Sequence, residues 1–238
     1  AARGAREKAP PPAVAPAWAY EGPGGPSAWG TLQPAYSLCG IGREQSPIDI
    51  RDGLAVDLEP VHFNYQPGHF AVLDTGRTVQ VKVAPGDRIE VAGRPYQLES
   101  LDFHHPAEER IDGRGFPMSV HLVHRDADGR VAVVALLVEP GEPQPVVQQV
   151  WNNLPLDRDD PQPARELLDP TRLLPVDRRY ATYLGSLTQP PCTEGVRWIV
   201  MRQPITLSPE QIALFARLYP MNARPLQPAR ARRILQSR

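Results

Sequence analysis

Proline occurs 29 times in the 238 residues and is spread along almost the whole chain. A proline inside an α-helix removes a backbone hydrogen bond and clashes with the preceding turn, so long helices are disfavoured. Between the prolines lie short segments that alternate polar and apolar residues, such as TVQVKV at 78–83. That alternation is typical of a half-buried β-strand. The chain is therefore predicted to be mainly β.

Further strands and two helices are predicted. The stretch 89–103 has the pattern of strand, tight turn and strand, and strands are also expected at 118–124, 131–138 and 197–207. The continuous apolar run VAVVALLV at 131–138 predicts a strand buried on both faces. Helices are expected at 146–154 and at 208–219, where Ser208 is a suitable N-cap.

Composition separates a leader from a single domain and indicates which kinds of partner are not expected. Residues 1–16 are rich in Ala, Pro and Arg without periodicity, which predicts a flexible leader before a single domain at 17–238. The formal net charge of -1 predicts no nucleic-acid partner. No apolar run reaches the roughly 18 residues that span a bilayer, so no membrane span is expected.

The two cysteines, Cys39 and Cys192, both lie in loops rich in Gly or Pro. Two lone cysteines are commonly buried thiols, but this loop position favours a disulfide. Such a bond would close a loop of about 150 residues and contribute about 4–5 kcal/mol in the chain-entropy model. It would also indicate an oxidising compartment, so the protein is predicted to be periplasmic or secreted.

Histidines occur on two of the predicted strands. Side chains alternate along a strand, so Asp102 and His104 share one face, and His121 lies on the strand at 118–124. If these strands are neighbours, the three side chains converge. Two imidazoles and a carboxylate with an open fourth position form a known kind of zinc site. Spacing alone favours the other interpretation, hydrogen-bonded strand histidines without a metal.

Several segments match one enzyme family in their residues and in their order along the chain. The most specific are QSPIDI at 45–50 and GSLTQPPCTEGVRW at 185–198. Others are WAYEG at 18–22, PMSVHLVHRD at 117–126 and YPMNARPLQP at 219–228. From residue 18 to about 228, the chain resembles the bacterial, disulfide-containing type of α-class carbonic anhydrase. The resemblance implies a large twisted, mostly antiparallel sheet with a few short surface helices.

The same resemblance implies a zinc site held by three histidines from two strands, and here the pattern is broken. Asp102 stands in place of the first histidine, whereas His104 and His121 match the second and third. Ser100 replaces a glutamine, and Ser119 a glutamate, that support ligands in the family. The zinc site is therefore predicted to be degenerate.

The resemblance also assigns roles around this site. Thr188 and Glu108 match the pair that orients the attacking hydroxide, Tyr20 matches a cleft tyrosine, and Arg77 stands at the proton-shuttle position. An arginine cannot carry protons near neutral pH because its pKa exceeds 12. The apolar substrate pocket of the family corresponds to Val123, Val133, Leu187 and Trp198, with Gln189 beside them.

These changes predict a carbonic anhydrase-related protein, a pseudoenzyme in which CO2 hydration is absent or strongly impaired. A carboxylate ligand lowers the charge of a zinc site from +2 to +1, which makes the bound water harder to ionise. Zinc is expected to bind weakly or not at all, and without it Asp102 can pair with a protonated His104 or His121. The alternatives are a weak zinc-dependent carbonic anhydrase that uses Asp102, His104 and His121, and a protein that binds another metal, a small anion or an unknown partner. The sequence specifies no oligomeric state.

Overall fold

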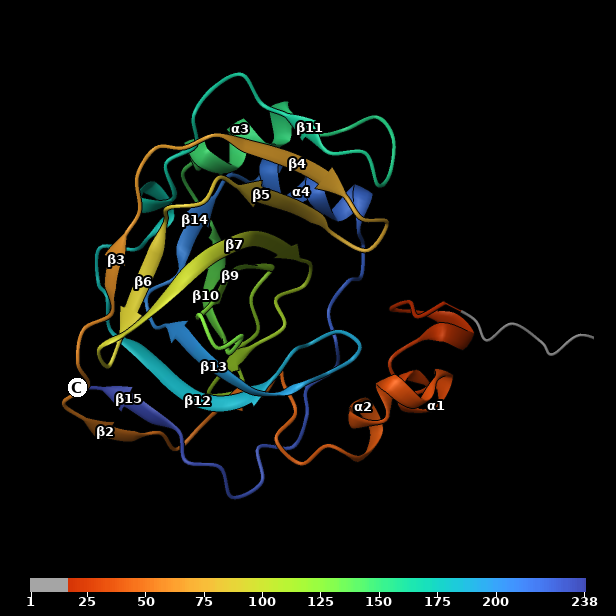
Figure 1. Cartoon of the computed structure of the whole chain (residues 1–238), viewed down its shortest axis with the longest axis vertical. Coiled ribbons are helices and arrows are strands. Elements are labelled where there is room, and N and C mark those ends of the chain that lie inside the picture. The colour runs from red at the N-terminus through yellow and green to blue at the C-terminus, as the bar shows by residue number, and fades with distance from the viewer. Residues whose placement is uncertain (1–16) are drawn as a thin grey trace, which may run out of the picture.

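The computed structural model describes residues 17–238 (Figure 1), so the leader predicted at 1–16 lies outside the described residues. The strands are β1 Asp49–Ile50, β2 Leu54–Val56, β3 His62–Asn64, β4 Phe70–Asp74, β5 Val79–Val83, β6 Arg88–Val91, β7 Arg94–His104, β8 Arg110–Ile111, β9 Met118–Arg125, β10 Val131–Pro140, β11 Gln162–Pro163, β12 Tyr180–Ser186, β13 Glu194–Met201, β14 Ile205–Leu207 and β15 Leu235–Ser237. The α-helices are α1 Trp29–Leu32, α2 Leu38–Ile41, α3 Pro145–Asn152 and α4 Pro209–Leu218.

One sheet of 13 strands organises the described chain, and its main path runs β11-β4-β5-β7-β9-β10-β13-β12-β15-β2. Most neighbours are antiparallel, whereas β10 pairs in parallel with β13 and β14, and β15 with β2. The predicted mainly β fold, with a large sheet and a few short helices, is confirmed. No helix of residues 17–238 is long and apolar enough to cross a bilayer.

The predicted elements agree with the structure, with shifted ends. The hairpin expected within 89–103 turns at Ala92 and Gly93, both of which have positive φ angles. The helix expected at 208–219 is α4, where the Ser208 side chain accepts a hydrogen bond from the backbone of Gln211 and the Gln211 side chain accepts one from the Ser208 backbone. The strand expected at 197–207 is interrupted before Pro204 and forms β13 and β14.

Two apolar clusters cover the faces of the sheet. On one face, Phe103 packs against Trp151 of α3 and Phe215 of α4, with ring centroids 4.8 and 6.0 Å away. On the other, a smaller cluster includes Val133 and Trp198. Because neighbouring residues of a strand point to opposite faces, Phe103 fixes Asp102 and His104 on the side away from these helices.

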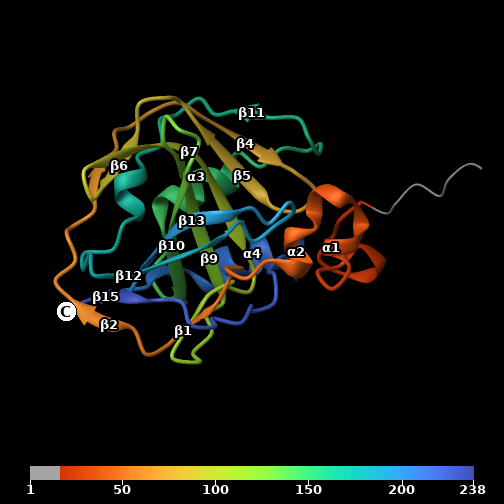
Figure 2. The same cartoon turned by 60° about the horizontal axis from the view of Figure 1, so that its bottom comes forward.

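The disulfide predicted between Cys39 and Cys192 is confirmed, and it joins residues 153 positions apart. It links α2 to the loop between β12 and β13. Both views place α1 and α2 together at one side of the molecule (Figures 1 and 2). The bond therefore holds this peripheral segment against the sheet, with the buried Trp29 packed beside it.

Removing the disulfide should lower the free energy of unfolding. For a closed loop of this length the chain-entropy model gives about 5 kcal/mol. We expect the double variant Cys39→Ser, Cys192→Ser to lose most of this in guanidinium denaturation, and a reducing agent to have no further effect on it. A loss below about 1 kcal/mol would contradict the expectation.

His124 is a fully buried histidine on β9 whose Nε2 lies 2.7 Å from the hydroxyl of Tyr65. Burial disfavours the charged ring and lowers the pKa of His124 from 6.5 to about 3. As the pH falls, His124 binds a proton in the unfolded chain before it does so in the folded protein. The neutral ring therefore contributes stability that is complete above pH 6.5 and is lost as the pH falls toward 3.

We expect His124→Gln to flatten the decline of stability with acid. The pKa values of His124 in the unfolded and folded states differ by about 3.5. The parent protein can therefore lose at most roughly 5 kcal/mol of its free energy of unfolding through this histidine. The free energy of unfolding should be measured between pH 7 and pH 4, with the exposed His62→Gln as the matched control. If parent and His124→Gln lose the same stability over this range, burial of neutral His124 is not the cause.

Candidate functional site

The site is built on the antiparallel pair β7 and β9 near the middle of the sheet. In their register Asp102 lies opposite His121, and His104 lies opposite Ser119. All four side chains are buried. The expectation that these strands are neighbours is confirmed, and the two imidazoles face each other with ring centroids 4.5 Å apart.

His104 is held by the segment that follows α4. Its Nδ1 lies 2.9 Å from the backbone oxygen of Asn222, which can only accept, so this nitrogen carries the proton. The Asn222 side chain is fixed in turn: it donates to the oxygens of Phe103 and Arg77 and accepts from the amide of His105. The lone pair of His104 is therefore on Nε2, where a metal ion could use it.

His121 is supported by Glu109, a residue that the sequence reasoning did not select. Oε1 of Glu109 lies 2.9 Å from Nε2 of His121, whereas the hydroxyl of Ser119 is 3.4 Å from the same nitrogen. The Glu109 side chain has no exposed surface, and neither oxygen has an aligned hydrogen-bond donor among residues 17–238. Glu109 is therefore the nearest acidic group to His121.

The pKa values of this pair reflect burial and mutual attraction. Burial alone would raise the pKa of Glu109, but the nearby His121 outweighs it and the pKa is lowered. Burial would likewise lower the pKa of His121, but Glu109, Glu108 and Asp102 together raise it. In the metal-free protein, both partners thus favour their charged forms.

Asp102 points to a different partner. Its carboxylate accepts a hydrogen bond of 2.7 Å from Nε2 of Gln80, the residue opposite it on β5. Burial raises its pKa, although Gln80 and the two imidazoles act in the other direction. Among the described residues, the ligand-capable atoms within 4.8 Å of one another belong to His104, Glu108 and His121. The structure thus brings together two of the three predicted ligands and places Glu108, not Asp102, beside them.

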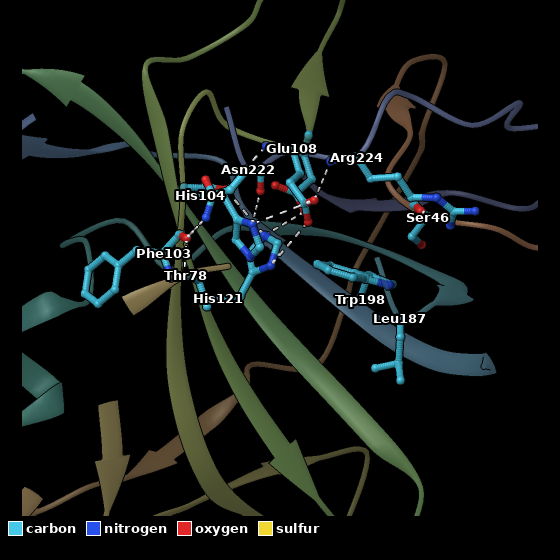
Figure 3. A network of polar contacts seen from close by, with 12 residues as sticks. Ser46, Thr78, Phe103, His104, Glu108, His121, Leu187, Trp198, Asn222 and Arg224 are labelled. Atoms are coloured by element: carbon cyan, nitrogen blue, oxygen red, sulfur yellow. Dashed lines mark hydrogen bonds and ion pairs between the residues drawn. The ribbon is translucent and has the colours of Figure 1, made fainter. Parts of the chain in front are cut away.

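Glu108 is a buried carboxylate with one satisfied oxygen. Oε1 accepts a hydrogen bond of 2.8 Å from the amide of Arg224 and lies 3.7 Å from Nδ1 of His104. Oε2 lies 3.8 Å from Nδ1 of His121 and has no hydrogen-bond donor in the described chain. Figure 3 shows the carboxylate above both rings. The hydrogen bond expected from Thr188, which is also buried, is not formed.

Comparison with known proteins decides the family. The family model of eukaryotic-type carbonic anhydrase matches residues 24–238. This chain belongs to the carbonic anhydrase family. It is 39% identical over 219 residues to a carbonic anhydrase of Pectobacterium carotovorum, covering 92% of this chain and 90% of that protein. A carbonic anhydrase of Nostoc sp. is 39% identical over 229 residues, covering 92% and 86%.

A solved structure extends this likeness to the fold. The α-carbonic anhydrase from Thermovibrio ammonificans, in complex with the inhibitor sulfanilamide, superposes with a TM-score of 0.89 at 37% sequence identity. The match covers 92% of this chain and 98% of that one. The fold is therefore that of an α-carbonic anhydrase.

The apolar residues expected to form the carbonic anhydrase substrate pocket lie together across three strands. Val123 of β9 is opposite Val133 of β10, which is opposite Trp198 of β13. The ring of His121 meets Trp198 edge-on at 5.0 Å, and Leu187 packs against the same cluster. Gln189 is half-buried in the turn that leads to Cys192.

Arg77 makes two contacts with Trp18. Its Nε donates to the Trp18 backbone oxygen at 3.1 Å, and its guanidinium lies 4.2 Å from the ring centroid. Tyr20 packs edge-on against Trp18 and Trp29, and burial raises its pKa. The position that corresponds to a proton shuttle in the resemblance thus carries a fixed cation.

The role of Glu109 could have been inferred from two departures from the family pattern considered together. The resemblance places a histidine after Glu108 and a glutamate at position 119, whereas this chain has Glu109 and Ser119. In this chain a carboxylate from the loop between β7 and β8, not one from β9, contacts His121. Sequence reasoning treated the change at Ser119 as a loss because it did not consider the two positions together.

Removal of this carboxylate should lower the pKa of His121. In metal-free Glu109→Gln, burial acts on the ring without its nearest counter-charge, so we expect a lower pKa than in the parent. The ring 15N shifts followed by NMR against pH would measure it. Glu99→Gln, which removes a half-exposed carboxylate of β7 paired with Arg125, is the control and should leave the value unchanged. An unaltered His121 pKa in Glu109→Gln would show that Glu109 does not support the ring.

Proposed function

We propose that this member of the carbonic anhydrase family is a carbonic anhydrase-related protein in which CO2 hydration is absent or strongly impaired. The observation that carries the proposal is Asp102. It stands where the resemblance places the first zinc ligand, and its carboxylate is hydrogen-bonded to Gln80 instead of joining His104 and His121. The three-histidine set of the family is not available in this chain.

The charge of the site supports the same conclusion. Zinc held by neutral ligands keeps its full +2 charge, which brings the pKa of its bound water to about 7. In this chain His104 and His121 would hold the ion, and the third member of the cluster, Glu108, is a carboxylate. Each carboxylate that binds reduces the charge and raises the pKa of the water. We therefore expect little hydroxide at neutral pH.

Two further features oppose hydration. Glu108 does not accept a hydrogen bond from Thr188, so the hydroxyl of Thr188 is not oriented by it. Arg77 stands at the proton-shuttle position and is held against Trp18, and an arginine is not a proton carrier near neutral pH. Neither the orientation of a nucleophile nor the export of its proton is supported by these residues.

A second candidate is a weak zinc-dependent carbonic anhydrase, which converts CO2 and water to bicarbonate and a proton with Asp102, His104 and His121. The relatives that carry the name carbonic anhydrase favour it. So do the contacts to Asn222 and Glu109, which engage one nitrogen of each ring and leave Nε2 of His104 and Nδ1 of His121 for a metal ion. On either account the proposed location is periplasmic or secreted, because the disulfide requires an oxidising compartment.

The activity of the parent and of repaired variants separates these candidates. We expect negligible CO2 hydration by the parent in a stopped-flow assay with added zinc. Asp102→His should raise the rate, and Asp102→His with Ser100→Gln should raise it further, to a total gain on the order of 100-fold. The physical reason is that a third neutral imidazole, supported by a glutamine, leaves the zinc site its full +2 charge. Position 119 is left unchanged because Glu109 already contacts His121.

Two controls complete the test. Asp157→His, at an exposed position, should leave the rate at the parent level. Residual zinc-dependent hydration that disappears in Asp102→Ala would favour the second candidate. Turnover by the parent at the rate of an active relative assayed beside it would overturn the proposal.

A further inference from the structure

We propose that this chain retains a relocated divalent-metal site formed by His104, His121 and Glu108, from which Asp102 is excluded. The inference rests on the proposed function, since it takes the family's three-histidine set as broken at Asp102. It assigns Glu108 a new role, as a ligand instead of an acceptor for Thr188. Zinc or another divalent ion that accepts nitrogen and oxygen ligands is the class of cation that such a site would take.

The donor set is suited to such a cation. His104 and His121 each have one nitrogen engaged, with the backbone oxygen of Asn222 and with Glu109 respectively. This is the outer support that metal-binding imidazoles usually have, with a carbonyl or carboxylate on the nitrogen away from the ion. Two such imidazoles and one glutamate are a recognised ligand set for zinc with an open fourth position.

Glu108 supplies the independent observation that points to a cation. Its side chain is inaccessible to solvent, yet Oε2 has no hydrogen-bond donor in the described chain and lies 3.8 Å from Nδ1 of His121. A buried carboxylate oxygen without a donor loses its hydration with no compensation. A metal ion between the two imidazoles and this oxygen removes that cost. Asp102 has no such need, because Gln80 already donates to it.

The contacts of Glu108 are consistent with this assignment, since none of them is to Thr188. Oε1 of Glu108 is occupied by the amide of Arg224, and Oε2 faces the imidazoles. The relocated site therefore holds an ion while lacking the arrangement expected for CO2 hydration.

Metal titration of matched variants tests the assignment. Zn2+ affinity should be measured for the full chain by calorimetry with a competing chelator, and Co2+ binding by visible absorption. Glu108→Gln and Asp102→Asn each remove one buried carboxylate charge beside the same imidazoles. We expect Glu108→Gln to weaken Zn2+ binding about tenfold or more and to change the Co2+ spectrum. Asp102→Asn should stay within about threefold of the parent with its spectrum unchanged.

Glu108→Asp separates ligation from charge, because it keeps the charge but shortens the reach. It should weaken binding as Glu108→Gln does, and melting temperatures should show that each variant is folded. Stronger loss in Asp102→Asn than in Glu108→Gln, equal loss in both, or no Zn2+ binding by the parent at 100 times the protein concentration would each overturn the relocated site. Rapid CO2 hydration by the parent would instead overturn the proposed function, which is a separate measurement.

Discussion

The pairing register of β7 and β9 is the constraint on which the rest of the site depends. It sets Asp102 against His121 and His104 against Ser119 in the middle of a wide sheet. Phe103, packed between α3 and α4, prevents β7 from sliding by one residue, because a slip would move its ring out of the core and the polar side chains into it. The two imidazoles are thus held in place by apolar packing on the opposite face of the sheet. Their relative position does not depend on any ion.

Charge balance is the second determinant of this region. Asp102, Glu108 and Glu109 are 5%, 2% and 0% exposed, and they surround two imidazoles with the buried Arg224 nearby. The acidic groups outnumber the one guanidinium, so positive charge on His121 or on a bound cation would offset part of the difference. Burial raises the pKa of Asp102, and its hydrogen bond to Gln80 gives it a partner outside the imidazole pair.

Much of the fold was predictable because it depends on local patterns. Alternation of polar and apolar residues located β5, β7 and β9, the apolar run located β10, and Ser208 located the start of α4. The shared face of Asp102 and His104 followed from strand periodicity alone, whereas their convergence with His121 required the pairing of β7 with β9. The roles of Asn222 and Gln80 did not, because their contacts depend on how distant segments are brought together. Asn222 lies 118 positions from His104, and Gln80 lies 22 positions from Asp102. No short-range pattern encodes those distances.

By itself, the sequence determined which chemical groups are present: two histidines at the strand positions of a zinc site, an aspartate where a third is expected, and two cysteines in loops. These follow from residue identity and from the periodicity of two, which any strand obeys. Tertiary structure alone decided which carboxylate serves which imidazole. Glu109 lies closer to His121 than Ser119 does, and Glu108 instead of Asp102 joins the histidine pair. The physical reason is that a carboxylate acts over only a few ångströms, and the loop between β7 and β8 determines which of them comes that close.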